Sequence, residues 1–153
     1  MKTSPWFCMA LVAAAASVYA DDSADRAAIE ALLNESYLEG IYTVQDAGLV
    51  RQGFHPDFNL TVVDGDAVLY VPLEEWIAYE GLNLAEDLKS GGQLAKRGAS
   101  LSIGSIDIVD NVASVKAEVR IGGDLAYTNF YGLAKTRGEW RIVTKHFARH
   151  GNH

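Results

Sequence analysis

The chain has 153 residues, with 13 Lys and Arg against 20 Asp and Glu, and therefore a net charge of −7. A surface with that excess of negative charge repels a phosphate backbone, so the composition argues against nucleic-acid binding. The length suits a single domain. The only cysteine, Cys8, excludes a disulfide within the chain.

Residues 1–20 have the pattern of a cleavable signal peptide. Lys2 precedes an apolar run over residues 6–16, and small or short residues lead up to Ala20. The run is shorter than the about 20 residues that cross a bilayer, and two aspartates follow at once. The alternative is a buried N-terminal helix. We predict cleavage after Ala20, a secreted or periplasmic location, and a mature domain of residues 21–153 with no membrane segment and a net charge of −8.

The first half of the mature chain is rich in helix signals. Apolar residues recur at helical spacing from Ser23, a suitable N-cap, to a stop at Gly40. A second, short helix is predicted over residues 44–52. A third begins at Pro72, which a first helical turn tolerates, and could extend to about residue 89.

The remaining segments have the composition of β-strands. A hairpin turn, Asp64-Gly65-Asp66, separates two runs of β-branched and large apolar residues. Further strands are predicted over residues 101–109, 113–121, 125–135 and 140–149. Helices that precede strands indicate an α+β domain. We expect three helices packed on one face of a curved antiparallel sheet, with a conical cavity at one end.

Two pairs of segments resemble a known superfamily. Tyr37-Leu38-Glu39-Gly40 and Phe54-His55-Pro56-Asp57-Phe58 resemble the opening of NTF2-like proteins, and residues 127–133 and 138–147 resemble their last two strands, with a Gly-x-Trp-x-Ile pattern. The nearest branch is the putative lumazine-binding group, close to the SnoaL-like proteins. The resemblance covers most of residues 24–149. It implies a cone-shaped α+β barrel and often a homodimer through the sheet, but no single function, because members include isomerases, cyclases, dehydratases and non-catalytic binders.

The chain departs from the catalytic members of that superfamily. Ketosteroid isomerases of this fold use an aspartate base on the first strand, whereas residues 60–63 hold no acid and Asp64 lies in the turn. Asn129 stands where the lumazine-type group commonly has an acid. An amide can hold a ligand but cannot serve as a general base. Tyr37 lies about where the isomerases have their tyrosine donor.

Three residues are candidates for acid–base chemistry. His146 shares one side of its strand with Trp140, so it points into the cavity if that side is concave; the alternative is an exposed or interface histidine. His55 could titrate near neutral pH, or its ring could bond to local backbone beside Pro56. Tyr37 is the candidate proton donor.

Five further residues are candidates for ligand binding. Tyr127, Asn129 and Tyr131 share one face of the penultimate strand. With Trp76 and Tyr79 they could line an aromatic pocket for a flat organic ligand; the alternative is plain core and interface packing. A one-residue bulge in the last two strands would turn Tyr127, Asn129, Tyr131 and His146 outward. No metal or cofactor site is predicted.

Three functions therefore remain open. The first, which the missing base and the aromatic strand faces favour, is an exported small-molecule-binding protein without catalysis. The second is an isomerase- or dehydratase-type enzyme that uses a cavity histidine as acid or base. The third is a non-catalytic dimeric scaffold whose cavity is filled by its own side chains.

Overall fold

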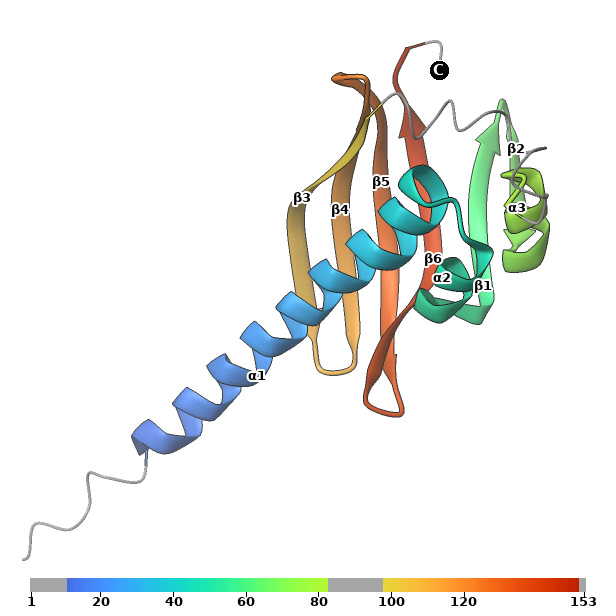
Figure 1. The fold of residues 1–153 in the computed structure, drawn as a ribbon. Coiled ribbons are helices and arrows are strands. Elements are labelled where there is room, and N and C mark those ends of the chain that lie inside the picture. Colours follow the sequence, from blue (N-terminus) through green and yellow to red (C-terminus); the bar gives the residue numbers. More distant parts are fainter. Residues whose placement is uncertain (1–10, 83–97, 152–153) are drawn as a thin grey trace, which may run out of the picture.

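The computed structural model describes residues 11–82 and 98–151, which form one sheet with helices on one face (Figure 1). In chain order the elements are α1 (Leu11–Leu32), the π-helix η1 (Leu33–Thr43), α2 (Ala47–Gly53), β1 (Phe54–Asp64), β2 (Ala67–Pro72), α3 (Leu73–Tyr79), β3 (Ala99–Val109), β4 (Val112–Ile121), β5 (Asp124–Thr136) and β6 (Glu139–Arg149). The α+β class and the predicted strands are confirmed. The predicted extension of the third helix to about residue 89 is wrong at its start, because α3 ends at Tyr79 and residues 80–82 form a turn in which Gly81 has a positive φ of 70°. Its part beyond residue 82 lies outside the described residues.

The helix boundaries differ from the sequence prediction. Ser23 lies inside α1 rather than at its start, and the helix continues through Gly40 to the end of η1. Gly40 is needed for close packing, because a Cβ there would come within 2.8 Å of the Val50 side chain. Helix α2 begins three residues later than predicted, after Asp46, whose Oδ1 accepts hydrogen bonds from the backbone N–H groups of Gly48 and Leu49. Within the described residues, no helix is both long and apolar enough to cross a membrane.

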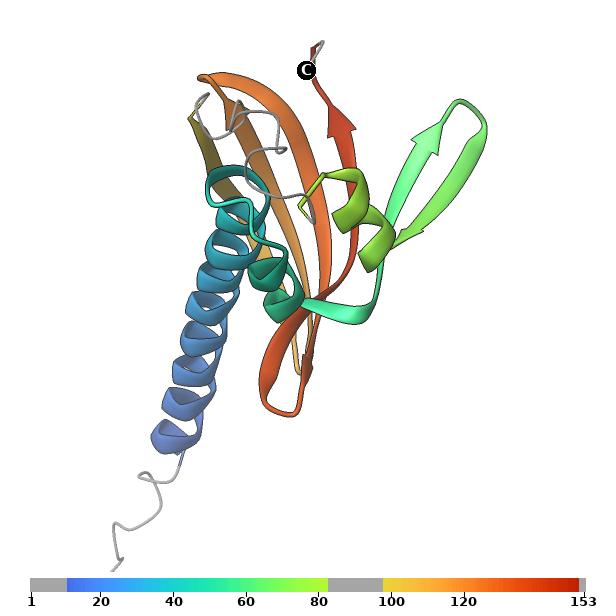
Figure 2. The same cartoon turned by 45° about the vertical axis from the view of Figure 1, so that its right-hand side comes forward.

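The sheet is mixed rather than fully antiparallel. Its strand order is β2-β1-β6-β5-β4-β3, and every neighbouring pair is antiparallel except β1 and β6, which run in the same direction. The hairpin β1–β2 curves away from the other strands, with α3 on its inner side (Figure 2). The expected antiparallel sheet is therefore corrected at one pair. That pairing joins the first strand to the last, and local periodicity carries no information on it.

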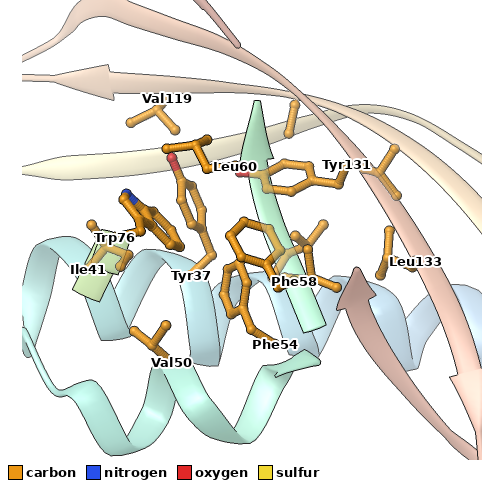
Figure 3. Close-up of a cluster of buried hydrophobic side chains, with 14 of the residues drawn as sticks. Tyr37, Ile41, Val50, Phe54, Phe58, Leu60, Trp76, Val119, Tyr131 and Leu133 are labelled. Carbon is orange, nitrogen blue, oxygen red and sulfur yellow. The ribbon is translucent and has the colours of Figure 1, made fainter. Parts of the chain in front are cut away.

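The core fills the space between the helices and the concave face of the sheet (Figure 3). Phe54, Phe58 and Trp76 form its aromatic centre, with ring centroids 4.8 to 5.5 Å apart. On β4 the predicted alternation is confirmed, because the residues that face inward are all buried: Ala113, Val115, Ala117, Val119 and Ile121. Burial of this apolar surface is the main stabilising contribution to the fold.

A buried carboxylate ties α1 to the last two strands. Asp25 Oδ1 accepts a hydrogen bond from Lys135 Nζ at 2.7 Å and another from the indole Nε1 of Trp140 at 3.0 Å. These hydrogen bonds lower the pKa of Asp25, with Lys135 contributing most. Trp140 itself is 5% exposed, so the contact anchors the N-terminal helix to the core.

A β-bulge interrupts the pairing of β5 with β6. Gly132 pairs with Thr144 and Leu133 pairs with Ile142, so Val143 has no partner on β5. The bulge reverses the facing of every residue after it. Gly132 permits the close approach, because a Cβ there would lie 2.7 Å from the Thr144 methyl group.

Candidate functional site

A cavity of about 570 Å³ lies between α3, the hairpin β1–β2 and the C-terminal half of β6. Its volume falls within the range of small-molecule sites, roughly 300 to 1,000 Å³. Residues from β4, β5 and η1 complete its walls. The lining consists of Tyr42, Leu60, Val62, Leu69, Val71, Glu75, Trp76, Tyr79, Glu80, Ile121, Tyr127, Lys145, Phe147 and Arg149.

Aromatic and aliphatic side chains make most of the wall. Trp76 is almost fully buried, whereas Tyr79 is 84% exposed and lies at the rim. Tyr127 and Phe147 pack edge to face, with ring centroids 5.7 Å apart. Walls of this kind suit a flat organic molecule, because aromatic faces offer large contact area at low entropic cost. The predicted ligand residues Trp76, Tyr79 and Tyr127 thus all line the cavity.

Lys145 is a buried lysine on the β6 side of the cavity. It is 5% exposed, and its Nζ lies 4.6 Å from the ring centroid of Phe147, 5.3 Å from that of Tyr37 and 5.5 Å from that of Trp76. Ring faces attract an ammonium group, which offsets part of its desolvation cost. Within the described part of the chain, its amine makes no hydrogen bond or ion pair.

Burial changes the acid–base behaviour of this lysine. Loss of hydration disfavours the charged form and lowers the pKa of Lys145 from 10.5 to about 7, against a smaller opposing effect of the Glu80 carboxylate. About half of the Lys145 side chains are therefore neutral amines at neutral pH. A neutral amine accepts a hydrogen bond or attacks a carbonyl carbon, and an ammonium does neither.

Glu80, like Glu75, is an acid that lines the same cavity as Lys145, and it is the one that interacts with the lysine. Trp76 Nε1 donates a hydrogen bond to Glu80 Oε1 at 2.9 Å, which fixes the carboxylate just beyond the end of α3. Burial raises the pKa of Glu80, while the Trp76 hydrogen bond and the charge of Lys145 oppose that rise. The cavity therefore combines a weakly basic amine with a carboxyl group whose proton affinity is raised.

A second group of predicted residues lies in the core, outside the cavity wall. Asn129 Nδ2 donates a hydrogen bond to the Tyr37 hydroxyl at 3.0 Å, and that hydroxyl lies 3.2 Å from the hydroxyl of Tyr42. Burial raises the pKa values of Tyr37, Tyr42 and Tyr131 well above the ordinary value, so these phenols are neutral. Among the described residues, the Tyr131 hydroxyl and Asn129 Oδ1 have no hydrogen-bond partner. The predicted residues Tyr37, Asn129 and Tyr131 are absent from the cavity lining, whereas Tyr42, which was not singled out from the sequence, belongs to it.

The two candidate histidines lie elsewhere. His146 is exposed on the outer face and stacks on Phe130, with ring centroids 5.2 Å apart, so of its two alternatives the exposed histidine is the one observed. The bulge at Val143 is the cause, and it turns Lys145 inward in the same step. The β5 residues keep their inward facing. His55 Nδ1 accepts a hydrogen bond from the Asp57 backbone N–H at 3.1 Å. This is the alternative in which the His55 ring bonds to the local backbone.

Sequence reasoning missed Lys145, and no local signal could have found it. A lysine next to a histidine on a strand is ordinarily assigned to a wet face, since lysine is rarely buried. Only the bulge places it opposite Leu60 and Tyr131, both of which are buried. Across the described ranges, no cluster of histidine, cysteine, aspartate and glutamate could hold a metal ion.

Comparisons with known proteins agree with the fold described above. Residues 24–148 match the family described as "Putative lumazine-binding". An NTF2-like protein of unknown function from Shewanella baltica is 25% identical, with a TM-score of 0.66 over 85% of this chain and 97% of that one. Two further NTF2-like proteins share the fold. The one from Silicibacter pomeroyi is 21% identical, with a TM-score of 0.66 over 84% of this chain and 98% of that one. The one from Methylobacillus flagellatus is 23% identical, with a TM-score of 0.63 over 83% of this chain and 93% of that one. No curated protein matches the chain.

Proposed function

Because the chain belongs to the Putative lumazine-binding family of NTF2-like proteins, we propose that it is an exported protein that binds a flat, conjugated organic molecule with carbonyl groups. The observation that carries this proposal is the aromatic cavity with Lys145 buried in its wall. Lumazine, the compound in the family's name, is a molecule of this class.

The lining supports each part of that ligand description. Trp76, Tyr127 and Phe147 offer ring faces and edges for a planar ring system. The Lys145 ammonium can donate a hydrogen bond to a carbonyl oxygen or compensate an anionic ring. Lys145 has no competing hydrogen-bond partner in the described part of the chain, so a ligand oxygen would remove part of the cost of burying its charge.

The two rival functions have less support. An enzyme with a cavity histidine needs a histidine in the wall, and His55, His146 and His150 are all absent from the lining. A scaffold filled by its own side chains needs a closed interior, whereas the described residues leave about 570 Å³. The binding function requires only the cavity that is present.

Tryptophan fluorescence provides the test, with lumazine as the probe. The mature chain holds two tryptophans, Trp76 in the cavity wall and Trp140 outside it, so a Trp140→Phe background reports on the cavity alone. We expect saturable quenching by lumazine, at least tenfold weaker in Tyr127→Ala. Val109→Ala is the control, because Val109 is 72% exposed on β3 and lies outside the cavity lining. Absence of saturable quenching, or equal loss in both variants, contradicts a lumazine-type ligand.

Export of the chain is part of the proposal. It is supported by the signal-peptide pattern of residues 1–20, and by a family match that begins at residue 24. The N-terminal half of α1 also extends beyond the end of the sheet (Figures 1 and 2). The mass of the protein recovered from periplasm or medium tests it: we expect the mass of residues 21–153, and retention of residues 1–20 would contradict cleavage.

We also propose that the outer face of strands β2, β1, β6 and β5 pairs two copies of the chain. Register places Tyr70, Thr61, His146 and Phe130 in one row across these four strands. Tyr70 is 69% exposed and Phe130 is 38% exposed, which gives this part of the face aromatic area. Light scattering on the purified mature protein should give twice the chain mass, and Phe130→Glu should reduce it to one chain. A monomeric wild type contradicts the pairing.

A further inference from the structure

Lys145 has the surroundings of a nucleophilic lysine. Its primary amine lies in the wall of a cavity large enough for a small molecule, against the rings of Phe147, Trp76 and Tyr37. Lysines that form covalent adducts with carbonyl compounds are activated by such apolar, desolvated pockets. A structural lysine on the helix-covered face of the sheet would be expected to pair with a carboxylate, as Lys135 on β5 does with Asp25.

We propose that Lys145 forms a reversible imine with an aldehyde or ketone group of a conjugated ligand held in the cavity. This inference rests on the proposed binding function, because the aromatic walls must first hold the ring system beside the amine. It goes beyond that function by assigning a covalent site and a reactive class of ligand.

The cavity supplies every protein group that imine formation requires. The Nζ lone pair of the neutral amine attacks the carbonyl carbon, a C–N bond forms, and the nitrogen gives up a proton as the oxygen becomes a hydroxyl. The resulting carbinolamine then loses water, which is formed from that hydroxyl and a proton. The C=N bond of the imine remains. Glu80 is the proton-transfer group, since its carboxyl lines the same cavity and interacts with Lys145. Hydrolysis reverses each step.

The protonation state of the amine agrees with this role. With a pKa lowered to about 7 by burial, roughly half of the Lys145 side chains are reactive at neutral pH, against about one in a thousand or fewer for an ordinary lysine. The titratable or charged groups that line this cavity or lie against Lys145 come from four elements or their ends: Tyr37 and Tyr42 from η1, Glu75, Tyr79 and Glu80 from or just after α3, Tyr127 and Tyr131 from β5, and Arg149 from β6.

Reductive trapping with benzaldehyde and cyanoborohydride at pH 7 tests the assignment on the mature wild-type protein. We expect one fast adduct per chain, at Lys145. Trypsin does not cleave after an alkylated lysine, so the adduct appears in a peptide of residues 142–149. Lys116 is the matched internal control, an exposed lysine on the outer face of β4. Labelling of Lys145 should be at least tenfold faster than that of Lys116, and the rate at Lys145 should level off above about pH 7.

Two variants and a competition complete the design. Lys145→Arg, which keeps the charge without the nucleophile, should abolish the fast adduct, and Lys116→Arg should leave it. Saturating lumazine should slow labelling of Lys145 only. Labelling of Lys145 no faster than that of Lys116 overturns the imine assignment, and saturable lumazine quenching would still support the binding function. Fast labelling without lumazine quenching would instead support the imine and refute the lumazine-type ligand. The peptide map uses wild-type protein, so it decides the question even if a variant does not fold.

Discussion

Replacing Lys145 with methionine should stabilise the protein at neutral pH and remove part of its pH dependence. Methionine has a similar length and packs well against aromatic rings, but carries no charge. The pKa of Lys145 is about 7 in the folded state and 10.5 at its ordinary value. Between those pH values the unfolded chain binds more protons than the folded one at this residue, so the stability of the wild type rises with pH.

The size of the effect follows from proton linkage. Each pH unit contributes at most about 1.4 kcal/mol, and integration from pH 7 to pH 9 with a folded pKa of about 7 gives roughly 2 kcal/mol. Lys145→Met has no such titration. Its stability advantage over the wild type should therefore shrink by about 2 kcal/mol over that range. The neighbouring phenols Tyr37, Tyr42 and Tyr131 stay neutral there, because burial raises their pKa values.

Urea unfolding at pH 7, 8 and 9, followed by circular dichroism, measures the difference. Lys116→Met is the control, because it makes the same substitution at a lysine that is exposed on the outer face. A difference between the wild type and Lys145→Met that stays constant from pH 7 to pH 9 would refute the reasoning. It would mean that Lys145 remains fully charged, or becomes solvated, in the folded protein.

Three further changes test the fold. Trp140→Ala should lower the free energy of unfolding by about 3 to 5 kcal/mol, since Trp140 is buried; a denaturant midpoint close to wild type would argue against that. Asp25→Asn should cost about 1 to 3 kcal/mol at pH 7. Lys135 and Trp140 lower the pKa of Asp25, so the stabilisation by its carboxylate is fully present above about pH 4 and is lost as the pH falls through the folded pKa. The unfolding curves of the wild type and Asp25→Asn should therefore converge in acid. Gly53→Ala should cost about 1 to 3 kcal/mol by overpacking, because its Cβ would overlap the Ser36 side chain; an unchanged midpoint would mean that α2 moves freely.

The sequence determined those features that depend on near neighbours along the chain. Alternation from Ala113 to Ile121 predicts a strand with one buried face, because a strand turns successive side chains to opposite sides. Asp64-Gly65-Asp66 predicts the hairpin of β1 with β2, since Gly65 adopts the positive φ of 57° that such a turn requires. The aromatic residues Trp76, Tyr79 and Tyr127 were identified from their spacing, and the structure brings all three to one cavity.

The tertiary structure decided the rest, above all the identity of the polar group in the cavity. Two-residue periodicity along β6 predicts that His146 faces the same side as Trp140 and Ile142. That prediction would be correct if β6 were a regular strand. The unpaired Val143 shifts the phase by one residue and exchanges the roles of His146 and Lys145. A bulge is set by hydrogen bonding and packing against the neighbouring strand, so no pattern within β6 signals it. The parallel pairing of β1 with β6 also joins segments distant in the sequence, and it brings Leu60 beside Lys145. Burial of that lysine, and the low pKa that follows from it, therefore arise only when the whole sheet has formed.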